Sequence, residues 1–263
     1  MFNKLNFVAL IGLLFISTCV FAQNPQIVQW ENQLLNEEGL SKKESKSVYN
    51  KYDFSKFWTQ TENSSVLGFI GNDYQRIRVK IISAVKDKSN SDIYKISGKS
   101  LVKNNLCSFS GTMKISKIRL YDQMRWGVDD EYKNKGIKKQ GILIGDYKFA
   151  ENGCSAAGIF EGRFASYWYL DKNGKIKYDD IETESDGYSN NQFAGIWKSN
   201  SGKTTKICNW GDYRIPLSGD LDIGAGEFSP DEKYLKSGWQ NYHDAYFGNN
   251  EKARAEENRI WWK

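Results

Sequence analysis

The chain has 263 residues, a formal charge of +5 and a mean hydropathy of −0.64, and 14% of its residues are aromatic. This length suits one large domain, and the small excess of Lys and Arg is dispersed, without the basic block that nucleic-acid binding requires. The single histidine, His243, excludes a multi-histidine metal site. No phosphate-binding or dinucleotide motif is present, so the sequence predicts no cofactor.

The first 22 residues have the pattern of a secretory signal peptide. Lys4 precedes an apolar run from Phe7 to Ile16, and Val20-Phe21-Ala22 follows at the cleavage position. We therefore expect an exported chain, periplasmic or extracellular, with no transmembrane span after cleavage of residues 1–22. The residues before Cys19 resemble a lipoprotein signal, so a lipid anchor through Cys19 is the alternative.

Residues 23–66 are predicted to form a helical N-terminal segment. Asn24 and Pro25 suit the N-cap and the first helical position, and Gly39 ends the run. The apolar residues between them follow helical spacing: Ile27, Trp30 and Leu34. Ser41-Lys42-Lys43-Glu44 matches a capping box and predicts a second short helix.

From residue 74 the apolar residues alternate, as they do in half-buried antiparallel strands. Eight such runs lie in the predicted domain 67–228, enough for an antiparallel meander that forms a curved or closed barrel. The predicted strands are Tyr74–Lys86, Asp92–Lys103, Leu106–Ile118, Gln140–Glu151, Gly158–Leu170, Lys175–Ile181, Gln192–Ser199 and Lys203–Trp210.

Glycines inside these runs favour a strongly curved sheet. Five of them share the apolar face of their strand, where a glycine permits a close approach or a sharp bend: Gly98, Gly111, Gly145, Gly162 and Gly195. The run Gly158–Phe164 resembles MORN-type hairpin repeats, so an open MORN-like β-meander is the alternative fold.

Residues 229–263 are predicted to form a helical element packed on the barrel. Ser229-Pro230-Asp231-Glu232 has the pattern of a helix start. One apolar stripe follows, made of Leu235, Trp239, Tyr242 and Tyr246. We expect this helix to pin the irregular segment 210–227 over one open end of the sheet.

Three cysteines remain after the signal peptide, which allows one disulfide and one free thiol. Cys107 shares a strand face with apolar residues, Cys154 lies in a turn, and Cys208 ends a strand. We predict the pair Cys107–Cys208, although spacing alone does not settle the connectivity.

The segment from Cys208 to Glu227 is the best place in the sequence to look for function. Its run Cys208–Pro216, together with Leu67–Gly71 and Tyr74-Gln75-Arg76, resembles a family of secreted bacterial proteins that has no known activity. The resemblance would cover most of the mature chain. It implies export and adds nothing about mechanism.

Tryptophans outside the predicted core are candidates for ligand binding. Trp210 and Trp126 could stack on sugar rings, while Arg76, Asp212 and Arg214 could bind hydroxyl groups. With few catalytic constellations in the chain, we predict a non-enzymatic binding or interaction protein. Its partner would be a small amphipathic molecule or a glycan at the barrel mouth, or another protein.

Clustered carboxylates suggest the alternative. Asp220, Asp222 and Glu227 could serve a glycosidase-like extracytoplasmic hydrolase, or bind calcium as hard oxygen ligands. Their spacing departs from an EF-hand because Gly224 and Ala225 replace the expected ligand and turn glycine. A solvated loop is the favoured interpretation, so we predict no metal site.

Overall fold

The computed structural model describes residues 24–263. The predicted signal peptide, Met1–Ala22, and the alternative anchor site Cys19 lie outside these described residues. No helix among residues 24–263 is long and apolar enough to cross a membrane.

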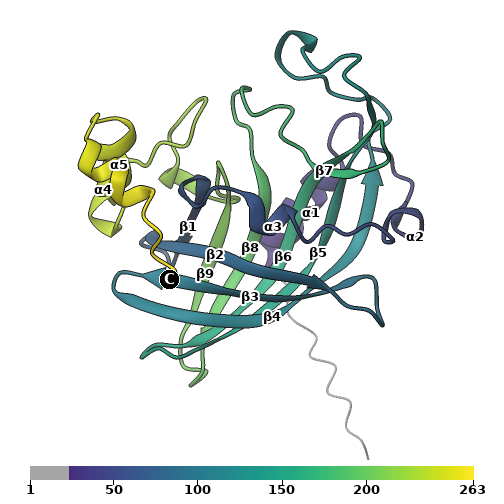
Figure 1. Ribbon diagram of the computed structural model, residues 1–263. Helices are drawn as coiled ribbons and strands as arrows, with labels where there is room; N and C mark the ends of the chain where they lie inside the picture. The colour runs from purple at the N-terminus through teal and green to yellow at the C-terminus, as the bar shows by residue number, and fades with distance from the viewer. Residues whose placement is uncertain (1–23) are drawn as a thin grey trace, which may run out of the picture.

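The described chain forms one antiparallel sheet whose strands follow one another around a ring (Figure 1). The strand order is β5-β4-β3-β2-β1-β9-β8-β6-β7, and pairing of β5 with β6 closes the circle. β7 pairs with β6 beyond the end of β8. The strands are β1 Val66–Ile70, β2 Gln75–Lys86, β3 Ile93–Val102, β4 Asn105–Leu120, β5 Ile137–Asn152, β6 Gly158–Asp171, β7 Ile176–Tyr178, β8 Asn190–Ser199 and β9 Thr205–Asp212. The predicted mainly β fold with a curved antiparallel meander is confirmed.

We call the two ends of the ring the mouth and the base. The mouth carries the long β4–β5 and β7–β8 connections and the start of β1, whereas the base carries the short β3–β4, β5–β6 and β8–β9 turns. The base turns include Gly153 and Gly202, whose positive φ angles of 71° and 72° suit glycine.

The interior of the ring is filled by side chains. Twenty-four buried residues form one cluster, most of them inward-facing on the strands. At Gly145, a Cβ atom would lie 2.1 Å from the Lys114 carbonyl oxygen and 2.6 Å from the Phe164 ring. At Gly195, it would lie 2.3 Å from the Tyr147 hydroxyl. These glycines therefore let aromatic rings cross the strands, which is the close approach the sequence predicted.

Helix α1, Pro25–Leu35, covers the outer face of the ring. The Asn24 side chain caps it by accepting a hydrogen bond of 3.0 Å from the Gln26 amide. Its buried residues Ile27 and Trp30 pack against outward-facing residues of β5, β6 and β8: Ile142, Ile144, Ala165 and Ala194. The following helix, α2 Lys46–Tyr49, begins after Ser45, later than the predicted capping box.

The C-terminal element covers another part of the outer face. It comprises a 3-10 turn, Glu232–Ser237, and helices α4 Gln240–Tyr246 and α5 Glu251–Glu257. Trp239 and Tyr242 pack with Leu67 and Phe69 of β1. Since Ile70 belongs to the interior cluster, this contact is on the outside of the ring. The C-terminal element therefore packs on the sheet, but against the wall of the ring, and the predicted single helix is divided into a 3-10 turn and two short helices.

A different segment covers the mouth, which corrects the prediction for residues 210–227. Phe54, Phe57 and Trp58, in and just before helix α3, Phe57–Gln60, join the interior cluster with exposures of 0–6%. Figure 1 shows this segment crossing the upper end of the ring. Residues Ile215, Leu221 and Phe228 instead join the outer cluster over β1. We call Phe54–Thr61 the plug, because it fills the opening with aromatic side chains.

Candidate functional site

The structure brings only two of the predicted ligand residues together, Trp210 and Asp212, and it buries both. Trp210 lies inside the ring with 2% of its surface exposed, and its ring stacks on Phe193 with centroids 4.8 Å apart. Strand β9 extends beyond Trp210 to Asp212, so the inward alternation of Cys208, Trp210 and Asp212 turns all three side chains into the core. The assignment of Trp210 to a ligand surface was therefore wrong.

Asp212 is a buried acceptor at the mouth. Its Oδ2 accepts hydrogen bonds from Thr61 Oγ1 (2.8 Å), Tyr178 OH (2.9 Å) and Asn191 Nδ2 (2.7 Å). Burial raises the pKa of Asp212 to about 7, against the opposing effect of these donors. A cavity of about 20 Å³ adjoins this group, beside Trp58 and Lys80, which is room for a single water molecule.

Asn191 links Asp212 to the plug. It lies where the β8–β9 register shifts and has a positive φ of 43°, uncommon for a residue other than glycine. Its Nδ2 also donates to the Phe57 carbonyl oxygen, and its Oδ1 accepts from Ser166. The Trp58 indole donates to the same Ser166 hydroxyl. This network fixes the plug in place, so Asp212 has a structural role in the closed mouth.

The guanidinium groups of Arg76 and Arg214 are also bound by other residues of the protein. Arg76 faces outward, where its guanidinium pairs with Glu257 of α5 and lies 5.1 Å from the Trp239 ring. Arg78 pairs with the same carboxylate at 2.8 Å. Although burial opposes the change, the two guanidinium groups hold the pKa of Glu257 below its ordinary value. Arg214 binds Asp222 and donates to the carbonyl oxygens of residues 224–227.

Trp126 lies half-buried in the β4–β5 loop, and its carbonyl oxygen accepts a hydrogen bond from the Tyr132 amide. It is far in the fold from Arg76, which lies on the wall beneath the C-terminal element. Of the five predicted ligand residues, Trp210 and Asp212 share the small buried cavity at the mouth, whereas Trp126, Arg76 and Arg214 do not line it.

The predicted carboxylate cluster is divided among separate contacts. Asp220 is exposed and pairs with Lys233 and Tyr234, whereas Asp222 is buried on Arg214. Glu227 is exposed. Within residues 24–263, no three His, Cys, Asp or Glu side chains are grouped closely enough to hold a metal ion. Asp222 also accepts the Gly224 and Ser229 amides, which are turn contacts within its own loop.

The disulfide joins Cys107 to Cys154, so the predicted pair Cys107–Cys208 was wrong. Strands β4 and β5 pair with Ser108 opposite Asn152, and this register brings the turn cysteine beside Cys107. Cys208 is a buried free thiol in the interior. A disulfide is compatible with a location outside the cytoplasm.

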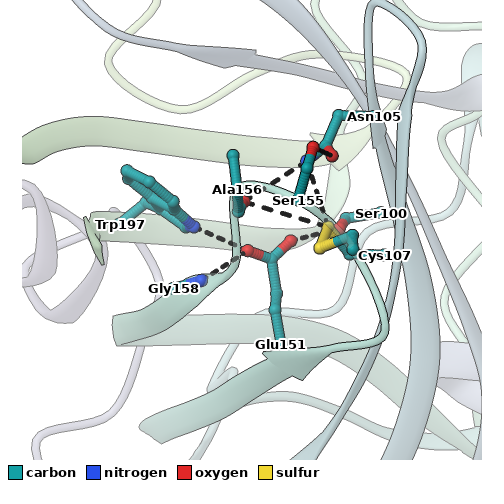
Figure 2. The surroundings of a disulfide bond; sticks show 9 residues. Ser100, Asn105, Cys107, Glu151, Ser155, Ala156, Gly158 and Trp197 are labelled. Atoms are coloured by element: carbon teal, nitrogen blue, oxygen red, sulfur yellow. Dashed lines mark hydrogen bonds between the residues drawn. A yellow bond between two sulfur atoms is a disulfide. The ribbon is translucent and has the colours of Figure 1, made fainter. Parts of the chain in front are cut away.

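Figure 2 shows a second buried carboxylate beside this disulfide, at the base of the ring. Glu151 Oε1 accepts from the Ser100 hydroxyl, and Oε2 accepts from the Gly158 amide (3.0 Å) and the Trp197 indole (2.7 Å). Burial raises the pKa of Glu151 despite these donors. Both carboxylate oxygens accept hydrogen bonds from the protein itself, so Glu151 links its own strand β5 to β3, β6 and β8 and has no oxygen left for a ligand.

A cleft of about 220 Å³ opens at the rim of the mouth, outside the plugged interior. We call it the rim cleft. Five separate segments line it: the residues just after α1, the β4–β5 loop, strand β5, strand β6 and the β7–β8 loop. The lining residues are Glu37, Tyr121, Arg125, Gln140, Tyr167, Asp179, Glu182, Ser185, Asp186, Gly187, Tyr188 and Ser189.

One wall of the rim cleft is a network centred on Glu37. Its carboxylate accepts hydrogen bonds from the hydroxyls of Tyr121 and Tyr167 and pairs with Arg125 at 2.5 Å. Burial, with Glu37 nearby, raises the pKa of both tyrosines well above their ordinary value, so both stay protonated. The Gln140 side chain bonds both the amide and the carbonyl group of Arg125.

Asp179 and Tyr188 also line the rim cleft, and the Asp179 amide donates a hydrogen bond to the Tyr167 carbonyl oxygen (3.2 Å). Burial, together with the neighbouring carboxylates Asp180 and Glu182, raises the pKa of Asp179 to about 6. A perturbed carboxyl group in a cleft is a common property of functional sites. The Tyr188 hydroxyl donates a hydrogen bond to the Asp179 carbonyl oxygen.

Sequence reasoning missed the rim cleft because most of its residues come from two polar loops, 121–136 and 179–189, that are distant from each other in the chain. The tyrosines that line it lie on strands or in loops without a shared spacing. An acidic loop rich in Ser and Tyr, Thr183–Asn191, was the one local signal.

No family model matches the chain, and no curated protein or solved structure matches it either.

Proposed function

We propose that this chain is an exported, non-enzymatic binding protein that holds a small hydroxyl-rich ligand, such as the end of a glycan, in the rim cleft. One observation carries the proposal. The interior of the ring is filled by side chains, and the rim cleft is the mouth-side hollow that combines aromatic rings with polar groups. Ligand sites in proteins typically combine these two kinds of surface.

The proposal moves the ligand from the residues expected by sequence to a neighbouring surface of the same mouth. Tyr121, Tyr167 and Tyr188 supply rings, while Arg125, Gln140 and Ser189 supply polar groups. The network around Glu37 holds the first wall in one arrangement, which lowers the ordering cost of binding. The disulfide and the predicted signal peptide support export.

The hydrolase alternative has less support. Its candidate carboxylates Asp220 and Asp222 are each engaged by a different basic residue, Lys233 and Arg214. A glycosidase pair needs two carboxyl groups facing one another across the bond to be cleaved. We therefore favour binding without catalysis.

A cleft-filling variant tests the proposal. Ser189→Trp would place an indole in the rim cleft, whereas Ser108→Trp would place one on an exposed outer position of β4. We expect an array of oligosaccharides to contain ligands that bind the wild type and the Ser108→Trp control and lose at least about tenfold in affinity with Ser189→Trp. Retained binding by a folded Ser189→Trp variant would place the ligand elsewhere.

A further inference from the structure

Charge in the rim cleft is unbalanced, although the whole chain is basic. Four carboxylates line the cleft, and Arg125 is its single cationic residue. Arg125 is already paired with Glu37. The three remaining carboxylates, Asp179, Glu182 and Asp186, form no ion pair with any residue of the described chain. The cleft is therefore a local negative site on a chain of formal charge +5.

Hydrogen-bond acceptors outnumber free donors there. Glu182 accepts from the Gly127 amide (3.0 Å) and from Ser185 (2.7 Å), so both its oxygens are occupied. Asp179 accepts one bond, from the Ile181 amide to Oδ1, and its Oδ2 has no partner among residues 24–263. The Asp186 carboxylate accepts no hydrogen bond within the same range.

The tyrosine hydroxyls do not balance this excess. Tyr121 and Tyr167 both donate to Glu37, and Tyr188 donates to a backbone carbonyl oxygen. A ligand that satisfies the open oxygens of Asp179 and Asp186 must bring its own donors. An ammonium group brings three donors and a positive charge, and aromatic rings attract such cations.

We propose that the rim cleft is selective for ligands that carry an ammonium group, such as an amino sugar or a polyamine. This inference rests on the proposed binding function of the same cleft. The ammonium group would lie between Asp179 and Asp186, with the rest of the ligand against the tyrosine wall.

A proton-linked signature follows from Asp179. Its pKa of about 6 in the free protein reflects burial and the carboxylates Asp180 and Glu182, against the opposing effects of the Ile181 amide and Arg125. A bound ammonium group favours the ionised carboxylate, so binding at pH 6 should release protons. Titration calorimetry in buffers of different ionisation enthalpy measures this release.

The test compares matched probes by titration calorimetry: a glucosamine trimer with free amines, its fully N-acetylated counterpart, and spermine. We expect the free-amine trimer to bind at least about tenfold more tightly than the acetylated trimer, which corresponds to one charge-assisted contact. Asp186→Asn and Asp179→Asn should each remove most of this preference. Glu184→Gln removes the same charge from an exposed residue of the same loop outside the cleft lining, and should leave it unchanged.

The outcomes separate the two proposals. Equal binding of the amine and acetylated trimers, blocked by Ser189→Trp, would overturn the ammonium inference and leave the binding function standing. Binding of spermine without either trimer would support the charge selectivity and reject a sugar. Failure of all three probes to bind at millimolar concentration would overturn the ammonium inference, while the oligosaccharide array with Ser189→Trp decides the binding function separately.

Discussion

The mouth and the base of the ring each bury one carboxyl group among hydrogen-bond donors, but they do so by different means. At the base, the oxygens of Glu151 share three donors, and the disulfide lies beside them. At the mouth, one oxygen of Asp212 accepts all three bonds, and a cavity of about 20 Å³ adjoins it.

The origin of the donors differs as well. The Glu151 donors lie on or beside strands of the sheet, and the disulfide closes the β4–β5 pair. The Asp212 donors come from the plug, β7 and β8, and Thr61 is 151 residues away from Asp212 in sequence. The base is thus held by strand pairing and a covalent bond, whereas the mouth depends on a segment that only tertiary contacts keep in position.

The largest effect is expected from removing the aromatic centre of the plug. Trp58→Ala deletes a buried ring and its hydrogen bond to Ser166, and should lower the free energy of unfolding by about 3–5 kcal/mol. Urea denaturation measures the change. Val85→Ala, at a side chain that is 57% exposed, is the control and should change it by less than about 0.5 kcal/mol. A similar small loss for Trp58→Ala would show that the plug contributes little.

Loss of the disulfide at the base should cost about 2–4 kcal/mol. The double variant Cys107→Ser/Cys154→Ser frees a loop with a sequence separation of 47 residues in the unfolded chain. The same denaturation assay, run on oxidised and reduced wild type as well, checks the value. Cys208→Ser controls for loss of a thiol outside the disulfide, and a stability unaffected by reduction would contradict this role.

Stability should fall as the pH rises from 5 to 7, and the mouth should dominate the change. The folded-state pKa of Asp212, about 7, exceeds the unfolded value of 3.8, so the folded state binds the extra proton and loses this advantage as pH rises through 7. We expect a decrease on the order of 2 kcal/mol from this group between pH 5 and pH 7. Asp179 and Glu151, whose pKa values are also raised, act in the same direction.

Matched variants assign the pH dependence. Asp212→Asn should remove most of the slope, whereas Glu151→Gln should remove a smaller part. The measurement is the unfolding free energy at half-unit pH steps for each variant. An unchanged slope in Asp212→Asn would assign the effect to other carboxyl groups.

The smallest effect compares one donor at each end. Thr61→Val and Ser100→Ala each remove one hydroxyl from a buried carboxyl group, and each should cost about 1 kcal/mol. Each loss raises the pKa of its own carboxyl group, so Thr61→Val should change the pH profile around pH 7, where Asp212 titrates, whereas Ser100→Ala should change the part due to Glu151. Identical pH profiles for both variants would contradict the distinction between the two ends.

Alternation predicted most strands to within a few residues, but β1 was missed for a physical reason. Leu67 and Phe69 face the C-terminal element while Ile70 faces the interior, so both faces of β1 are covered. A strand buried on both faces has no polar alternation to detect. The covering residues, Trp239 and Tyr242, lie more than 160 residues later in the chain.

The ligand site was harder to predict than the strands, because Trp210 was interpreted as an exposed residue although the alternation of β9 turns it inward. Trp210 was placed at a strand end, although β9 continues for two more residues and keeps it inside. The disulfide depended on the β4–β5 register, which the long loop between these strands does not specify. The rim cleft depends on where two long loops fold back, and no local spacing records that.

β1 pairs with β2 along one edge and with β9 along the other, so its second edge must wait for residues 205–212. Contacts this distant in sequence make folding slow. During synthesis, the edge of β1 stays unpaired until nearly the whole chain has been made. The ring therefore stays incomplete for long after its first strands form. Until β9 has been made, the exposed edge of β1 needs protection from association with the strand edges of other chains.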